Sequence, residues 1–209
     1  MEGRYLLLGI LFAIELVIIF ILVPGDWTET VIKREHALMD NRYTDETNEL
    51  INATATRWYK KTMIDSGIYV GLYRHLIPSA EDKKNSKGME NLGSFWFNWL
   101  ESRIDSLAYS VYHFYNRVAL LMIWLPYFLI LLIPSLYDGY NRWRIKRTNF
   151  DYSSSIVHHY SKLLTVLSVW SLVLLFLAPI VVEPTIIPAV IMLVCVLVGH
   201  TVGNLQKRI

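Results

Sequence analysis

The sequence alternates between long apolar blocks and polar segments. Four blocks of 19 or 20 residues carry almost no charge, and they cover residues 5–23, 118–137, 163–182 and 185–203. About 20 apolar residues, rising about 1.5 Å each, cross a hydrocarbon core of about 30 Å. The helices of soluble proteins are usually shorter. The pattern therefore predicts an all-α polytopic membrane protein with four transmembrane helices and a helical exported segment between the first and second.

The ends of the blocks suggest how they are connected. The first block, within residues 1–23, is too long for a signal peptide and lacks a small-residue cleavage motif, so we expect an uncleaved anchor. The last two blocks are separated only by Glu183 and Pro184, which predicts a tight antiparallel hairpin over residues 163–203.

Charge indicates the orientation. The chain carries 20 Lys and Arg against 18 Asp and Glu, and a net charge of +2 argues against a globally basic nucleic-acid binder. Eight of the basic residues lie in residues 1–4, 138–162 and 204–209. Short cytoplasmic segments are enriched in Lys and Arg. We therefore expect both termini in the cytoplasm of a bacterial cell, the protein in the inner membrane, and residues 24–117 in the periplasm.

The exported segment is expected to be helical, because it lacks the alternating runs typical of β-strands. Helix-favouring residues are frequent between positions 28 and 63, with a break expected near residues 41–44. A polar loop is expected over residues 79–93. A further helix is predicted from Ser94, and no breaker separates it from the second apolar block, which is compatible with one continuous helix.

That last exported helix is rich in aromatic residues and carries an apolar stripe at spacings of three and four. The stripe consists of Phe97, Leu100, Ile104, Leu107, Ala108, Val111, Tyr115 and Val118. Two interpretations of its aromatic density remain open. The helix packs within the chain and at the lipid interface, or it presents a surface to a partner protein.

Glu15 lies ten residues inside the first block, near the bilayer midplane. An ionisable group at this depth has to face protein and be neutral or paired. Polar groups at a similar depth include Tyr127 and Ser171. Glu15 is therefore expected to hydrogen-bond within the chain, to contact a transmembrane helix of another subunit, or to belong to a proton or ion path.

The cytoplasmic side carries the remaining candidate chemistry. Arg142, Arg144, Lys146 and Arg147 form a basic cluster suited to anionic lipid, and topology alone explains them, so direct DNA contact is not expected. Gly199-x-x-x-Gly203 is a spacing that permits close helix packing. With Cys195 as the single cysteine and no catalytic or cofactor motif, we expect neither an enzyme nor a bound cofactor or metal.

Two segments of the sequence resemble a known family. They are WLESRIDSLAYSVYHFYNRVALLMIWLPYFLILLIPSLYDGYNRWRIKR and SSSIVHHYSK. They are similar to membrane proteins of integrating conjugative elements and conjugative plasmids, including the TraJ-like proteins of H-type plasmid transfer systems. The most specific matches are Leu125-Pro126, Pro134, Asp138-Gly139 and His159-Tyr160. The chain has RTNFDYSSS where members often carry a Gly-rich stretch.

The resemblance implies an accessory role in conjugative DNA transfer through a type IV secretion channel, beside its coupling ATPase or other channel subunits. It implies no enzymatic activity. The matching positions in the cytoplasmic loop are Asp138, Arg142, Arg144, His159 and Tyr160. Two other functions are open from the residues: a small transporter or ion-conducting unit using Glu15 and His200, or an exclusion-type protein acting through its exported helix. A homo-oligomer is also open.

Overall fold

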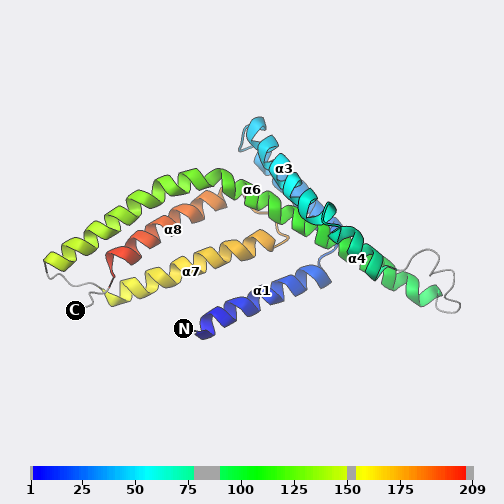
Figure 1. Ribbon diagram of the computed structural model, residues 1–209, viewed down its shortest axis with the longest axis horizontal. Coiled ribbons are helices and arrows are strands. Elements are labelled where there is room, and N and C mark those ends of the chain that lie inside the picture. Colours follow the sequence, from blue (N-terminus) through cyan, green and yellow to red (C-terminus); the bar gives the residue numbers. More distant parts are fainter. Residues whose placement is uncertain (1, 78–89, 150–153, 206–209) are drawn as a thin grey trace. The chain divides into compact units, whose positions relative to one another are not determined.

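The computed structural model describes residues 2–77, 90–149 and 154–205, and every regular element in these ranges is helical (Figure 1). The expectation of an all-α fold is thereby confirmed. The helices, in chain order, are α1 (Glu2–Leu22), α2 (Gly25–Asp40), α3 (Asp45–Tyr59), the π-helix η1 (Lys60–Ile64), α4 (Ile68–Leu76), α6 (Glu90–Thr148), α7 (Ser155–Leu177) and α8 (Ile186–Gly203).

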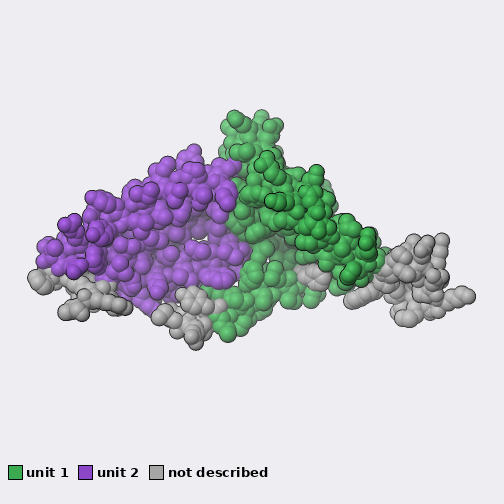
Figure 2. Space-filling view, in the orientation of Figure 1, with its two compact units in different colours: residues 1–119, 176–184 green, residues 120–175, 185–209 purple. Residues whose placement is uncertain are grey.

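The chain forms two compact units (Figure 2). One comprises residues 1–119 and 176–184, and the other comprises residues 120–175 and 185–209. Among the described residues, three helices are long and apolar enough to cross a membrane: α6, α7 and α8. The apolar stretch of α1, Leu6–Ile19, is shorter. The count of four transmembrane helices therefore stays a prediction.

α1 is joined to α6 at its C-terminal end. The last carbonyls of a helix lack partners within the helix. Here the guanidinium of Arg103 donates to the carbonyls of Ile21, at 3.1 Å, and Val23, at 2.7 Å. The hydroxyl of Ser106 donates to Val23 as well, at 2.9 Å. These contacts fix the point where the chain leaves the first apolar helix.

α2 and α3 form a helical pair. The residues between them are 41–44, so the predicted break is confirmed. α2 starts after Pro24, and α3 starts after Thr44, with Asp45 and Glu46 in its first turn, where a helix dipole favours acidic groups. The Asn48 amide of α3 donates to the Asp40 carboxylate at the end of α2, at 3.0 Å. This bond closes the turn between the two helices.

The core of the first unit lies where α2 and α3 meet the first half of α6. Its buried apolar side chains are Val31, Ile32 and Met39 of α2, Ile51 and Ala55 of α3, and Leu100, Ile104 and Ala108 of α6. Edge-to-face ring contacts join Trp58 to Tyr115 and Tyr59 to Tyr112. The residue number of the partner on α6 decreases, from 115 to 112, as the residue number on α3 increases from 58 to 59. α3 therefore runs antiparallel to α6.

α4 extends the same antiparallel path. It begins after Gly67, whose φ of 74° lies in the left-handed region that glycine adopts readily. The Tyr69 hydroxyl donates to Asp105 of α6 at 3.1 Å, and Tyr73 hydrogen-bonds to Glu101. Both phenols have a raised pKa of about 12; burial and the bond to Asp105 raise that of Tyr69, and the bond to Glu101 raises that of Tyr73.

α6 is a single helix of 59 residues, so the expected continuity is confirmed. It begins at Glu90, four residues before the predicted start at Ser94, and the predicted polar loop lies mostly outside the described residues. It also continues to Thr148 through Pro126 and Pro134. The basic cluster expected in a cytoplasmic loop therefore lies on the last turns of a helix.

In the second unit, α8 packs along the second half of α6 in a parallel direction (Figure 1). The hydroxyl of Ser135 donates to the carbonyl of Cys195 at 2.5 Å, and Gly139 and Gly199 approach backbone to backbone. α7 runs antiparallel to α8, because His158 at its start hydrogen-bonds to the carbonyl of Thr201 at 3.0 Å.

The connection between α7 and α8 corrects one prediction. α7 ends at Leu177 and α8 begins at Ile186, so the connection is residues 178–185 and not Glu183-Pro184 alone. Pro179 and Pro184 lack the N–H that a helix requires. The apolar character of this stretch resembled a helix, but its backbone is irregular and is held by tertiary hydrogen bonds, as described next.

Candidate functional site: a buried ion pair that holds the α7–α8 connection

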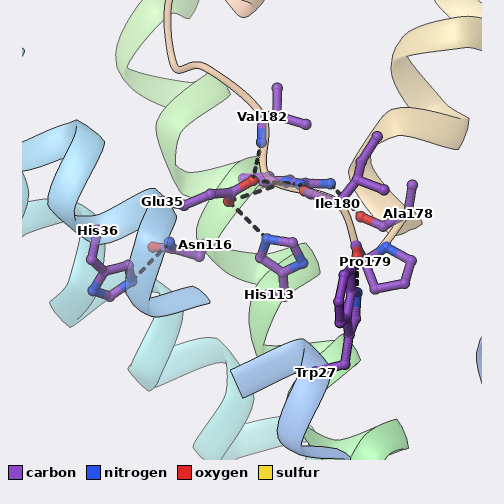
Figure 3. A network of polar contacts seen from close by, with 10 residues as sticks. Trp27, Glu35, His36, His113, Asn116, Ala178, Pro179, Ile180 and Val182 are labelled. Atoms are coloured by element: carbon purple, nitrogen blue, oxygen red, sulfur yellow. Dashed lines mark hydrogen bonds and ion pairs between the residues drawn. The ribbon is translucent and has the colours of Figure 1, made fainter. Parts of the chain in front are cut away.

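A polar cluster occupies the interior of the first unit, between α2 and α6 (Figure 3). Glu35 comes from α2, and His113 and Arg117 come from successive turns of α6. Each of these residues is no more than 4% exposed. Charged residues are rarely buried to this extent unless they are paired. The cluster is therefore a specific feature of the fold.

Glu35 is saturated with hydrogen bonds. Its Oε2 accepts from Nε2 of His113 at 2.7 Å. Its Oε1 accepts from Nη2 of Arg117 at 2.5 Å and from the backbone N–H of Val182 at 2.8 Å. The last bond joins α2 to the connection between α7 and α8, 147 positions away in sequence.

Arg117 binds the same connection from the other side. Its Nη1 donates to the carbonyl of Ala178 at 2.9 Å, and its Nη2 donates to the carbonyl of Ile180 at 2.5 Å. Trp27 of α2 donates its indole N–H to the carbonyl of Pro179 at 2.8 Å (Figure 3). The carbonyls of residues 178–180 and the N–H of Val182 thus find partners in α2 and α6.

The electrostatics favour an ionised Glu35. Burial alone raises the pKa of a carboxyl group, but the hydrogen bonds from His113 and Arg117 and the positive charge of Arg117 bring the pKa of Glu35 below its ordinary value. His113 donates through Nε2, while its Nδ1 is buried and has no hydrogen-bond partner among the described residues. A neutral imidazole fits this geometry, because a protonated Nδ1–H needs an acceptor.

His36 extends the cluster toward α6. The Asn116 amide donates to Nε2 of His36 at 3.1 Å (Figure 3). Burial lowers the pKa of His36, although the negative charges of Asp40 and Glu35 partly oppose the shift. A neutral His36 is the form that accepts this hydrogen bond.

Chemically, the arrangement is a closed clasp. We use the name Glu35 clasp for Trp27, Glu35, His113, Arg117 and residues 178–182. All of the carboxylate's contacts described above are to the protein's own donors. Among the residues that the structure describes, no group of three or more His, Cys, Asp and Glu is placed to hold a metal ion. The clasp fastens the α7–α8 connection onto α2 and α6.

The comparison with protein families decides the wider identity. Residues 24–206 match the family described as IncC plasmid conjugative DNA transfer protein DtrJ-like. The chain belongs to this DtrJ-like family. The resemblance to conjugative plasmid proteins is confirmed, and the DtrJ-like protein is a component of conjugative DNA transfer. The searches of curated proteins and of solved structures returned no match.

The candidate residues at the end of α6 and near the start of α7 of the DtrJ-like chain fall into separate contacts. Asp138 and Arg142 form an exposed ion pair at 2.9 Å, one turn apart on α6. Arg144, on the same helix, is exposed. His159 and Tyr160 are exposed near the start of α7, with their rings 5.8 Å apart.

The candidate residues within the apolar helices also lie in different contacts and do not form one site. Oε2 of Glu15 is buried without a hydrogen-bond partner among the described residues. Tyr127 is exposed with its ring 5.4 Å from that of Trp124, and Ser171 is exposed and donates to the carbonyl of Ser168. Gly199 lies against Ser135 and Gly139 of α6. A Cβ at Gly203 would meet Arg142 and Gly139 at 3.5 Å.

Sequence reasoning missed the clasp of this DtrJ-like protein. A signal was present in α6, where Arg103, Ser106, Ser110, His113 and Arg117 recur at spacings of three and four. All five are buried, and they form a polar stripe beside the apolar one. Nothing in the sequence pairs this stripe with Glu35 or with residues 178–182, because those contacts span between 61 and 147 positions.

Proposed function

We propose that this DtrJ-like protein is a non-enzymatic accessory component of a type IV secretion system, seated in the inner membrane. Both termini lie in the cytoplasm and residues 24–117 lie in the periplasm. The family match over residues 24–206 carries the proposal. The apolar helices support its membrane location, since large side chains such as Ile130 and Ile133 are each 65% exposed. A contiguous apolar surface of this kind needs lipid or protein to cover it.

The proposed partner is the coupling ATPase, or another subunit of the channel, at the end of α6. Arg144 and Arg147 are exposed there, and the guanidinium of Arg147 lies over the Trp143 ring at 5.5 Å from its centroid. Side chains held on a helix are presented in a fixed geometry, which favours a specific contact. Exposed arginines beside an aromatic ring are also typical of protein interfaces.

Glu15 is proposed as a second contact, made inside the membrane with a helix of another subunit, a second copy included. Its buried Oε2 has no hydrogen-bond partner among the described residues. A carboxyl oxygen in a low-dielectric environment gains from a donor that an adjacent helix can supply.

Photocrosslinking tests these contacts in conjugating cells. A photoreactive amino acid at Arg144 is expected to capture the coupling ATPase, and one at Glu15 is expected to capture a transmembrane subunit. The control position is Lys60, which is exposed on the exported η1. Arg144→Glu is expected to lower transfer frequency, whereas Lys60→Glu is expected to leave it near wild type. Capture of no transfer component at either test position would overturn the proposed partnership.

A further inference from the structure

Within the second unit, the seam between α7 and α8 is loosely filled. One face of α7 lines it, at spacings of three and four, with Lys162, Thr165, Val166, Val169 and Leu172. A cavity of about 130 Å³ lies beside Lys162, and another of about 180 Å³ follows farther along the seam. Figure 2 shows the surface hollowed where Figure 1 places these two helices next to each other.

The neighbouring seam between α6 and α8 shows how tightly this unit can pack. There Gly139, Gly199 and Ser135 bring two backbones together with no room for a Cβ. Protein interiors generally leave few voids larger than a water molecule. Apolar cavities of about 150 Å³ stay dry and accept small apolar molecules. The α7–α8 seam is therefore suited to an apolar ligand.

The threonines of the seam do not make it polar. The Thr165 hydroxyl donates to the carbonyl of Ser161 at 2.8 Å, and the Thr201 hydroxyl donates to the carbonyl of Leu197 at 2.8 Å. Both hydroxyl protons are thus used within their own helices. The second cavity is lined only by apolar side chains, such as Phe128 of α6 and Ile191 of α8. The lining of the two cavities therefore suits a hydrocarbon group.

A positive charge stands at one end of the seam. Lys162 is exposed, and among the described residues no carboxylate lies within 4 Å of its ammonium group. Lys146 adds a second charge at the same end of the unit, where it donates to Gly203 and Asn204 and not to a carboxylate. An anionic group is the complement of this end.

The seam also has the length of one lipid tail. From Lys162 to Leu172 the helix rises through ten residues, or about 15 Å, and this is half of a hydrocarbon core of about 30 Å. Lys162 directly precedes the charge-free stretch that begins at residue 163. A tail that starts beside Lys162 would therefore end near the bilayer midplane.

We propose that the α7–α8 seam binds one acyl chain of an anionic phospholipid, with the lipid phosphate against Lys162. The inference rests on the proposed membrane insertion of α7 and α8. The positive charge of Lys162 favours an anionic over a zwitterionic phospholipid. The two cavities hold the acyl chain. Bound lipid then completes the packing of α7, which protein atoms alone leave unfinished.

The full chain is reconstituted in phosphatidylcholine vesicles. The vesicles contain an analogue of either phosphatidylglycerol or phosphatidylcholine that carries a photoreactive group on its tail. After illumination, the labelled peptides are mapped by mass spectrometry. Labelling is expected at the seam, with about a fivefold preference for phosphatidylglycerol, the effect of one lysine near an anionic headgroup. Lys162→Glu abolishes this preference, and Lys60→Glu retains it. Val166→Trp fills the first cavity and lowers labelling, whereas Leu164→Trp, on an exposed face of α7, does not.

Equal labelling by the two lipids would overturn the proposal. Labelling of Leu164 and Leu167 as strong as that of the seam residues would overturn it as well. Crosslinks from the seam to a second copy would overturn it too, because a protein helix would then be the occupant. Topology reporters on the same variants separate this result from a failure of the proposed function. A chain that inserts and captures the coupling ATPase but shows no selective labelling contradicts the lipid site alone.

Discussion

At the scale of single residues, Glu35 carries the largest share of the clasp. Its carboxylate accepts hydrogen bonds both from α6 and from the α7–α8 connection. Removing one partner of a buried ion pair costs about 3–5 kcal/mol, whereas an exposed pair contributes about 0–1 kcal/mol. The difference arises because a buried charge left alone has lost its hydration.

Glu35→Gln is expected to destabilise the folded protein by about 3 kcal/mol, because the neutral amide leaves Arg117 buried without its counter-ion. The measurement is the thermal midpoint of the purified protein in detergent. Glu29→Gln is the matched control on the same helix, where Glu29 pairs with Lys33 at 2.6 Å on the surface. Equal shifts for the two variants would contradict a specific role of the clasp.

The histidine beside the clasp makes stability depend on pH. Burial lowers the pKa of His36 in the folded protein. Below about pH 6.5 the unfolded chain therefore binds more protons than the folded one, and stability falls as pH falls. Glu35, whose folded pKa is also lowered, adds a further loss in the more acidic range where an unfolded carboxylate takes up its proton.

His36→Gln is expected to reduce the loss of thermal stability between pH 7 and pH 5, because glutamine can still accept from Asn116 and does not titrate. Thermal midpoints over this range measure the effect. His75→Gln on α4 is the control, since His75 is exposed and the variant keeps His36. If the His36 variant loses as much stability as the wild type, burial of this imidazole is not the cause.

At the scale of elements, the contact between α6 and α8 depends on the absence of side chains. A Cβ at Gly139 would stand 2.5 Å from the carbonyl oxygen of Gly199. That oxygen belongs to a helix backbone and cannot rotate away as a flexible side chain would. Close approach of this kind is what small residues provide between transmembrane helices.

Gly139→Ala is therefore expected to separate the two helices and to lower thermal stability by about 1–3 kcal/mol, the usual cost of overpacking. Gly71→Ala is the matched control, because nothing lies within 4 Å of its Cβ position on α4. Alanine there should stabilise by up to about 1 kcal/mol through helix propensity. Thermal midpoints that fail to separate the two variants would refute the close contact.

Elements also differ in how far their sequences predicted them. The break at residues 41–44 and the continuity of α6 followed from local patterns. The α7–α8 connection did not, because residues 178–182 look like the end of an apolar helix. Their backbone is not helical, and Arg117 and Glu35 bind it. The local sequence does not show which distant residues will be its partners.

At the scale of the whole molecule, charge is distributed unevenly along a nearly neutral chain. Basic residues concentrate at the end of α6, and residues 24–117 carry both signs in similar numbers. This asymmetry orients helical membrane proteins during insertion. It predicts a cytoplasmic location for both termini.

Topology reporters test that orientation. Fusions after Asn85 and after Thr148 are expected to report opposite sides of the membrane, the periplasm and the cytoplasm respectively. The measurement is paired activity of an alkaline phosphatase and a fluorescent reporter that folds only in the cytoplasm. Substituting the four basic residues within 142–147 by glutamine should reduce the difference between the two reporter sites. Reporters that read the same side for both sites would overturn the proposed topology.

The sequence by itself determined the helical class, the apolar spans and the relationship to conjugation proteins, because these depend on composition, period and local motif. Only the tertiary structure decided that the buried face of α6 is partly polar, and that Glu35 and Arg117 hold residues 178–182. The reason is physical. A buried charge needs partners that complete its hydrogen bonds, and those partners are brought together by the fold and not by the order of residues in the chain.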